Sequence, residues 1–238
     1  MALRLPYRHE TFPRAPIVEA LVQFRVILPH LPTQEQISRF ADRIKDGFPN
    51  PRKLSRRVAR AALSLVNEER TQALRVRSTD FIFSHLQPYS NWESLRAAAL
   101  RYWPLYVDVF KPTRITHLGL QYINVVEMPG GPETISSMLS LIFVAPPEML
   151  QNFETSLSQL TFKDQDSAAR ATVLSLASPP HNSTDNWSVL LSIGAQESRL
   201  KYDPNDHSLI FATLDKLRDL KNELFFSVTT EEAKRMFR

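Results

Sequence analysis

Residues 16–28 alternate apolar and polar side chains, and this alternation constrains the fold more than any other feature of the chain. The apolar residues occupy every second position, as in a β-strand with one buried face: Val18, Ala20, Val22, Phe24 and Val26. A sheet with one apolar face must bury that face against another layer. We therefore expect a mixed protein in which helices cover one face of a sheet.

The first half of the chain predicts the element order β-α-β-β-α-β, which is the order of a ferredoxin-like unit. Helices are expected after two capping patterns, Thr33-Gln-Glu-Gln36 and Ser90-Asn-Trp-Glu93. Further strands are expected at residues 54–66, 71–86 and 113–126. The alanines within residues 58–65 leave a helix open as an alternative for the first of these.

The second half begins at the sharpest break in composition, Pro129-Gly-Gly-Pro132. Its pattern predicts the order α-α-β-β-β-α. The first two helices are expected near 133–143 and after Pro147, and the three strands at 157–163, 170–177 and 187–194. A long helix is expected at 206–225, followed by a last short helix capped by residues 229–232. The expected fold class is α+β. We predict a ferredoxin-like subdomain at 1–128 and a second subdomain at 129–238 packed on it, either as two related sheets or as one continuous sheet.

Composition excludes several kinds of chemistry. The chain contains no cysteine, so disulfides, cysteine-ligated zinc, iron–sulfur clusters and thiol nucleophiles are ruled out. The first 16 residues lack the apolar core of a signal peptide, and no apolar run reaches membrane-spanning length. A cytoplasmic location without a membrane partner is expected.

No familiar catalytic motif occurs in the sequence. The five glycines form no phosphate-binding loop, and the six histidines are scattered without metal-ligand spacing. Asp164 and Asp166 could hold magnesium, but a solvated turn is favoured because acidic residues usually lie in exposed loops. We expect no metal and no cofactor, and a non-enzymatic protein is favoured over an enzyme.

A basic segment spans residues 52–77, with eight basic residues against two acidic ones. The candidate contacts to an acidic partner or to nucleic acid are Arg52, Arg56, Arg57, Arg60, Arg75 and Arg77. Phe81 and Phe83 could stack on bases, but they alternate with Asp80 and Ile82 as core-facing strand residues do. A solvated face, or a surface for an acidic protein, is therefore favoured over a nucleic-acid site.

Four ordered segments carry a family resemblance: Pro-Ile-Val-Glu-Ala-Leu-Val-Gln-Phe-Arg at 16–25, Tyr-Ser-Asn-Trp at 89–92, Gly-Leu-Gln-Tyr-Ile-Asn at 119–124, and Leu-Lys-Asn-Glu-Leu-Phe-Phe-Ser-Val-Thr-Thr-Glu at 220–231. With them the chain resembles a sporadically distributed family of uncharacterised bacterial proteins. Such a distribution implies accessory genes, including toxin–antitoxin and phage-defence partners. Family members often have arginine where this chain has His117 and Gln121, and Asp-Ile-Asp where it has Ser192-Ile-Gly194.

Three polar residues in or beside the Gly119–Asn124 strand are candidates for a pocket: His117, Gln121 and Asn124. Asn124 stands in an apolar strand, so if it is buried it must be hydrogen-bonded. A structural role for this amide is favoured over a place in a pocket.

The preferred functional hypothesis is an interaction protein that binds another protein through a sheet edge or through its basic face. It would be an accessory, antitoxin-like or defence-associated partner. A nucleic-acid-binding protein that uses the basic segment is the alternative, and an enzyme of unfamiliar type comes third.

Overall fold

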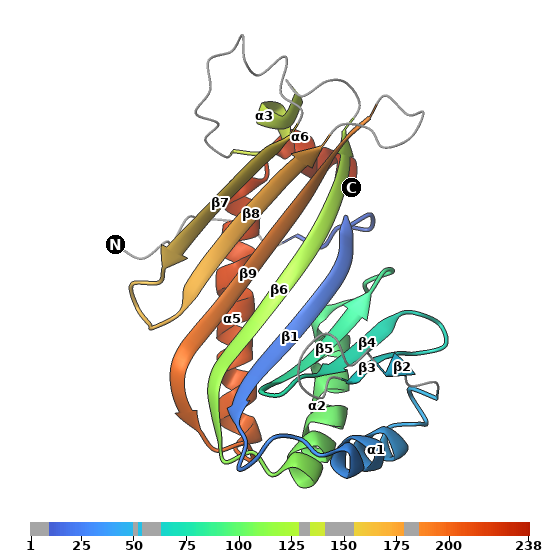
Figure 1. The fold of residues 1–238 in the computed structure, drawn as a ribbon. Coiled ribbons are helices and arrows are strands. Elements are labelled where there is room, and N and C mark those ends of the chain that lie inside the picture. The colour runs from blue at the N-terminus through green and yellow to red at the C-terminus, as the bar shows by residue number, and fades with distance from the viewer. Residues whose placement is uncertain (1–9, 50–51, 54–62, 129–133, 141–154, 179–185) are drawn as a thin grey trace. The chain divides into compact units, whose positions relative to one another are not determined.

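The computed structural model describes residues 10–49, 52–53, 63–128, 134–140, 155–178 and 186–238. Its strands form an antiparallel sheet with the hydrogen-bonded order β2-β3-β4-β5-β1-β6-β9-β8-β7 (Figure 1). The strands are β1 (Ile17–Ile27), β2 (Arg52–Lys53), β3 (Leu63–Val66), β4 (Gln72–Val76), β5 (Asp80–Leu86), β6 (Arg114–Met128), β7 (Ser156–Lys163), β8 (Arg170–Ser178) and β9 (Trp187–Tyr202). The predicted α+β class is confirmed.

Most of the described helices begin at a side chain that accepts a hydrogen bond from the first turn. They are α1 (Gln34–Arg43), α2 (Trp92–Phe110), α3 (Ile135–Met138), α5 (His207–Val228) and α6 (Glu231–Phe237). The predicted capping box of Thr33 and Gln36 is present. The other two caps lie one residue later than predicted, because Asn91 accepts from the Ser94 N–H and Thr230 from the Ala233 N–H.

The ferredoxin-like order predicted for the first half is not confirmed. Residues 71–86, predicted as one strand, are the two strands β4 and β5. The chain turns between them where Arg77 donates its N–H to the carbonyl of Asp80 over 2.8 Å, and the two strands pair antiparallel. A third strand, β3, joins β4 at the predicted polar turn, where Asn67 accepts from the N–H groups of Thr71 and Gln72.

The second half agrees with the predicted order in its strands and its long helix. Strands β7, β8 and β9 and helices α5 and α6 lie where they are predicted, although β9 continues eight residues beyond the predicted end at 194. The predicted helix after Pro147 lies outside the described residues, as do residues 54–62 of the first predicted hairpin. None of the described helices has the length and apolar character needed to cross a membrane.

The chain divides into two compact units. Unit 1 comprises Met1–Val18, Gln121–Ala195 and Arg218–Arg238, and unit 2 comprises Glu19–Leu120 and Gln196–Leu217. Each unit gathers segments from several parts of the chain, because β6, β9 and α5 are long elements that each begin in one unit and end in the other. The division into subdomains at 1–128 and 129–238 stays a prediction.

The core of unit 2 is aromatic. The rings of Phe24 and Trp103 stack with their centroids 4.4 Å apart, and Phe81 and Tyr106 pack against the Trp103 ring. The Trp103 indole N–H donates to the carbonyl of Pro204 over 2.9 Å, which satisfies a polar group that would otherwise be buried without a partner. Phe81 and Phe83 are fully buried, so the interpretation of both as core residues is confirmed.

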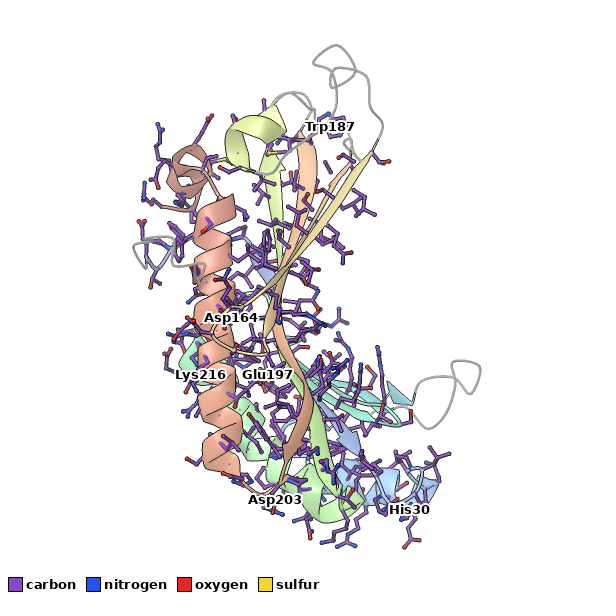
Figure 2. All side chains as sticks on the ribbon, turned by 90° about the vertical axis from the view of Figure 1, so that its left-hand side faces the viewer. His30, Asp164, Trp187, Glu197, Asp203 and Lys216 are labelled. Carbon is purple, nitrogen blue, oxygen red and sulfur yellow. The ribbon has the colours of Figure 1, made fainter. Side chains whose placement is uncertain are left out.

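The core of unit 1 lies between helices and the strands β6, β8 and β9, and it includes Val126, Val173, Leu191, Leu224 and Phe237. Strands β7 and β8 form a hairpin in this unit, and Asp164, labelled in Figure 2, lies in its turn. The alternation of apolar residues along β8 places Ala171, Val173 and Ala177 in the core.

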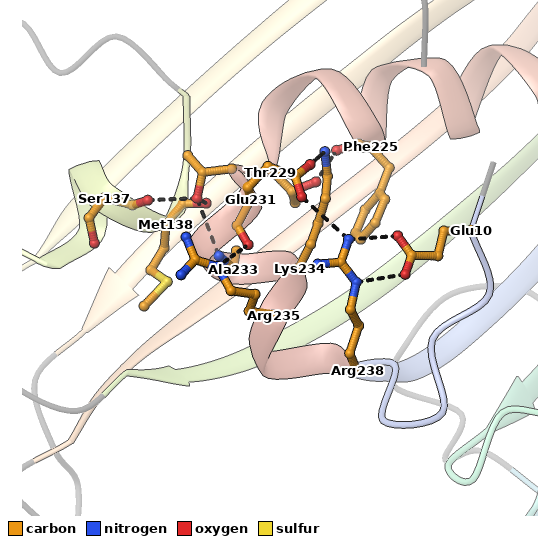
Figure 3. A network of polar contacts seen from close by, with 11 residues as sticks. Glu10, Ser137, Met138, Phe225, Thr229, Glu231, Ala233, Lys234, Arg235 and Arg238 are labelled. Atoms are coloured by element: carbon orange, nitrogen blue, oxygen red, sulfur yellow. Dashed lines mark hydrogen bonds and ion pairs between the residues drawn. The ribbon is translucent and has the colours of Figure 1, made fainter. Parts of the chain in front are cut away.

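The C-terminal helix α6 is held by polar contacts within unit 1 (Figure 3). Arg238 donates to both carboxylate oxygens of Glu10 over 2.7 and 2.8 Å, a bidentate geometry. The Thr230 hydroxyl donates to the carbonyl of Ser137 over 2.6 Å. Residues far apart in the sequence therefore fix the end of the chain against α3.

We expect Trp103→Ala to lower the free energy of unfolding by about 3–5 kcal/mol, because it opens a cavity in the aromatic core and leaves the Pro204 carbonyl without a donor. Urea denaturation followed by circular dichroism measures this change. Leu209→Ala is the matched control, since Leu209 is 42% exposed. Its unfolding free energy should change by no more than about 0.5 kcal/mol. Equal effects of the two substitutions would contradict the assignment of Trp103 to the core.

Candidate functional site

The predicted basic segment is only partly covered by the structure. Arg56, Arg57 and Arg60 lie outside the described residues, and only the main chain of Arg52 is described. Arg75 forms an ion pair with Glu19, with Nη1 and Oε1 2.9 Å apart. Arg77 is exposed beside the turn between β4 and β5. Arg75 is thus already neutralised by an acidic neighbour, which weakens it as a contact to phosphate.

The three residues predicted to form a pocket lie along β6. Gln121 and Asn124 are three residues apart, so their side chains leave opposite faces of the strand. The Gln121 amide donates to the Ser192 hydroxyl over 2.6 Å. Asn124 is 1% exposed and donates to the carbonyl of Leu191 over 2.9 Å. Gln121 and Asn124 therefore line no common pocket, and Asn124 has the contacts expected of a structural residue.

A buried carboxylate organises the polar face of unit 2. Asp80 accepts hydrogen bonds from Gln23 Nε2 over 2.7 Å, Arg25 Nε over 3.0 Å and the Thr79 hydroxyl over 3.0 Å. Burial by itself would raise the pKa of Asp80, but these hydrogen bonds and the Arg25 charge together lower it below its ordinary value. Asp80 is therefore an ionised acceptor at neutral pH. It is not a proton donor.

His117 lies near this cluster. Burial lowers the pKa of His117, the charge of Arg25 lowers it further, and the charge of Asp80 opposes both. The imidazole is consequently neutral at physiological pH, with Nδ1 3.0 Å from the Ser198 hydroxyl. Within the part of unit 2 that is described, Asp80 makes no hydrogen bond to His117. The hydroxyl, imidazole and carboxylate therefore do not form the connected relay that serine hydrolases require.

Two further buried polar residues occupy adjacent positions on β5. Among the residues that the structure describes, Ser84 Oγ and His85 Nε2 have no hydrogen-bond partner, and burial lowers the pKa of His85. Because they are adjacent on a strand, their side chains leave opposite faces of the sheet. Ser84 and His85 therefore cannot act together on one substrate.

Asp164 and Asp166 lie in the turn between β7 and β8. The Ser167 hydroxyl donates to Asp164, and Asp166 is exposed. Among the described residues, no group of three or more histidine or acidic side chains is placed to hold a metal ion. The arrangement is that of the solvated turn favoured from the sequence.

A lysine lies within the core of unit 1. Lys221, on α5, is 8% exposed, and its Nζ lies 3.7 Å from the centroid of the Tyr122 ring. No ion pair joins Lys221 to any described residue, and the nearby charge that acts on it is that of Arg218. Burial, and secondly the charge of Arg218, lower the pKa of Lys221 from 10.5 to about 7. The Lys221 amine therefore loses its proton at a much lower pH than an ordinary lysine does.

Strand β7 is the last strand in the hydrogen-bonded order of the sheet. Most of its side chains are exposed, including Leu157 at 68% and Leu160 at 39%. Leu176, directly opposite Leu157 on β8, is 37% exposed. The outer strand of unit 1 thus combines an apolar surface with main-chain groups that β8 does not use.

Sequence reasoning missed Asp80, Lys221 and the position of β7. Lys221 had a usable signal, because it follows Leu217 by four residues and Leu214 by seven, on the apolar side predicted for the long helix. Asp80 had none, since its hydrogen-bond partners Gln23 and Arg25 lie on a strand more than fifty residues away. The edge position of β7 depends on strand order, which no local pattern encodes.

We expect Asp80→Asn to lower the free energy of unfolding at pH 7 by about 1–3 kcal/mol, because a neutral amide loses charge-assisted hydrogen bonds. The contribution of Asp80 is present above its ordinary pKa of 3.8 and is lost as the pH falls through its lower folded-state pKa. Urea denaturation between about pH 2 and pH 7 measures the free energy of unfolding, which should fall less steeply toward acid pH in the variant than in the natural protein. An equally steep fall in both proteins would contradict this role of Asp80.

We expect Lys221→Met to raise the free energy of unfolding at pH 7 by about 2–4 kcal/mol, because methionine fills the space without a buried amine. The folded-state pKa near 7 lies below the ordinary value of 10.5, so the unfolded chain binds more protons between these limits. The stability of the natural protein should therefore rise with pH across that window, and the variant should lose this rise. The control is Lys216→Met, at an exposed lysine of the same helix, which should leave the pH dependence intact.

Comparison of the chain with models of protein families finds no match, and comparison with curated proteins finds none either. The resemblance to the sporadically distributed bacterial family accordingly stays a prediction. A fold hosts many activities, so function has to be argued from the chemistry of particular sites. Three places remain for that argument: the Asp80 cluster, Lys221 and the outer strand β7.

Proposed function

We propose that this protein is a non-enzymatic binding protein that holds an extended segment of another protein at strand β7. The observation that carries the proposal is an eight-residue outer strand without the features that ordinarily block pairing with a further chain. Its ladder with β8 is continuous over Ser156–Lys163, so no bulge interrupts it. The strand contains no proline, and its one charged residue, Lys163, stands at its end. In the described part of the chain, no strand lies beyond β7 (Figure 1).

The hydrogen-bonding pattern tells which main-chain groups β7 offers. Asp164 donates its N–H to the carbonyl of Ala169 over 3.0 Å, which makes that opposed pair a hydrogen-bonded one. Hydrogen-bonded and non-bonded pairs alternate along an antiparallel ladder. This alternation makes Thr161 and Thr172 a non-hydrogen-bonded pair, in which side chains lie closer together. Their hydroxyl oxygens are 3.1 Å apart, which agrees with that assignment. The N–H and C=O groups that point away from β8 therefore belong to Leu157, Gln159, Thr161 and Lys163.

The side chains indicate the chemistry of the partner. Leu157 and Leu176 make an exposed apolar pair on one face of the hairpin, and Leu160 is exposed on the other. A partner strand with apolar side chains and little charge would cover them, while main-chain hydrogen bonds supply the pairing. Such a partner fits the accessory, antitoxin-like or defence-associated class that the bacterial resemblance implies.

The ionisable groups of unit 2 favour binding over catalysis. Glu19 is paired with Arg75, and Asp80 with Arg25. The pKa of Asp80 is lowered by its hydrogen bonds and by the Arg25 charge, so this carboxylate is a poor general acid. These groups are better suited to fixing neighbouring strands than to moving protons.

The test is a native pull-down with the full-length protein and two variants. Gln159→Pro removes an N–H that points away from β8, so it blocks a partner strand and leaves the β8 ladder intact. Leu157→Lys places a charge on the apolar surface. Each substitution should reduce the captured partner about tenfold or more relative to the natural protein. Leu209→Lys makes the same change at an exposed leucine of α5 and should capture the partner normally.

Circular dichroism and the melting temperature establish that each variant is folded. Undiminished capture by Gln159→Pro, or a clean monomer with no partner, would contradict the proposal. A second copy of this chain as the occupant would appear as a dimer in sedimentation equilibrium. If Gln159→Pro abolished that dimer, the proposal of a different partner protein would be wrong.

A further inference from the structure

Ser198 lies where the alternation of buried and exposed side chains along β9 shifts by one residue. Ala195 is buried at an odd position of the strand, whereas Leu200 is buried at an even one. Between them Arg199 has φ 64°, in the left-handed region that residues other than glycine rarely adopt. Such a shift with left-handed backbone indicates a β-bulge, and bulges re-aim side chains next to active sites. This one follows directly after Glu197, labelled in Figure 2, and leaves the Ser198 side chain exposed.

The exposed Ser198 hydroxyl is hydrogen-bonded to a buried imidazole. Its Oγ lies 3.0 Å from Nδ1 of His117 on β6, and neither side chain makes another hydrogen bond to a residue that the structure describes. In the tautomer that carries its hydrogen on Nε2, Nδ1 accepts the proton of the Ser198 O–H. His117 is 7% exposed and neutral at physiological pH, as a general base must be. A base shielded from water therefore contacts a hydroxyl that solutes can reach, which is the contact that activates a serine nucleophile.

A guanidinium group with unused donors belongs to the same part of unit 2. The strand order β5-β1-β6-β9 places Asp80, Arg25, His117 and Ser198 on four consecutive strands. Asp80 lies directly opposite Arg25 and fixes it through Nε, 3.0 Å from Oδ1. Arg25 is 52% exposed, its charge acts on His117, and its Nη1 and Nη2 donate to no described residue. A guanidinium fixed in this way can stabilise the negative oxygen that forms when a carbonyl is attacked.

We propose that Ser198 is a nucleophile that takes an acyl group from a small activated ester, with His117 as its general base and Arg25 as the donor to the oxyanion. The ester reaches the site from solvent, because the Ser198 and Arg25 side chains are exposed. Within the described residues of unit 2, Asp80 makes no hydrogen bond to His117, so the imidazole lacks the carboxylate that orients it in efficient hydrolases. We therefore expect the acyl-serine to accumulate. The site is independent of the binding role proposed for β7.

The reaction balances without any further reactant. The Ser198 oxygen forms a bond to the acyl carbon as its proton passes to His117 Nδ1, and the C=O π electrons move to the carbonyl oxygen. This oxygen becomes negative and accepts hydrogen bonds from the Arg25 Nη groups. The C=O bond then forms again, and the bond to the leaving oxygen breaks. The leaving group takes the proton from His117, so the products are an acyl-serine and an alcohol.

The experiment treats the full-length protein with p-nitrophenyl acetate at neutral pH and locates the acetyl group by peptide mapping with mass spectrometry. We expect acetylation of Ser198 about a hundredfold faster than acetylation of Ser38, because a positioned general base contributes about 10²–10⁴ in rate. Ser38 is an exposed serine on α1 that has no hydrogen bond to a described histidine. Hydroxylamine should remove the group from Ser198, as it does from an ester but not from an acetylated lysine. Ser198→Ala should lose this adduct, and Ser38→Ala should keep it.

Two further variants test the roles of the neighbouring residues. His117→Gln should slow acetylation of Ser198 about a hundredfold, and Arg25→Met about tenfold. Arg77→Met, at another exposed arginine of unit 2, should leave the rate unchanged. Circular dichroism establishes that each variant is folded, and the exposed positions Ser198 and Arg25 keep the test decisive if His117→Gln does not fold.

The proposal is overturned if Ser198 is acetylated no faster than Ser38. It is equally overturned if a folded His117→Gln variant, or Arg25→Met, reacts at the rate of the natural protein. None of these outcomes bears on partner capture at β7, because the acetylation assay contains no partner protein.

Discussion

Burial of one face of the antiparallel sheet is the constraint on which the rest of the structure depends. In unit 2 the aromatic residues Phe24 and Phe81 direct their rings toward Trp103 on α2, and in unit 1 Val173 and Leu191 belong to the core. Successive side chains of a strand point to opposite faces of the sheet. Burial of the side chains on one face therefore leaves those on the other face to contact solvent or other groups. Asp80 illustrates the consequence, because it precedes Phe81 by one residue and satisfies its charge with Gln23 and Arg25.

The sequence predicts those parts of the fold that depend on local pattern. The alternation over residues 16–28 yields β1, and the capping box at Thr33 yields the start of α1, because both signals lie within a few residues. The hairpin between β4 and β5 was missed for a physical reason. Its turn, Arg77-Ser-Thr-Asp80, contains neither glycine nor proline, and apolar residues continue on both sides of it.

What the sequence could not predict is set by long-range pairing. The Arg75–Glu19 ion pair joins residues 56 positions apart, and it removes a charge that looked available for phosphate. The division into units is equally non-local, because β6 and β9 are long strands that pass from one unit into the other. The predicted subdomain boundary at Pro129 rests on a break in amino-acid composition. The compact units are defined instead by contacts between strands that are distant in the sequence.

Lys221 and β7 share a physical logic although they are separate features of unit 1. Each is a place where the most stable choice is not taken: leucine would suit the position of Lys221, and charge or proline would guard the edge of β7. Sequences agree with their fold at most positions, and departures concentrate where function requires them. The departures here differ in kind, since one hides an amine in the core and the other exposes main chain at the surface. An open strand suits another chain, which is the role proposed for β7.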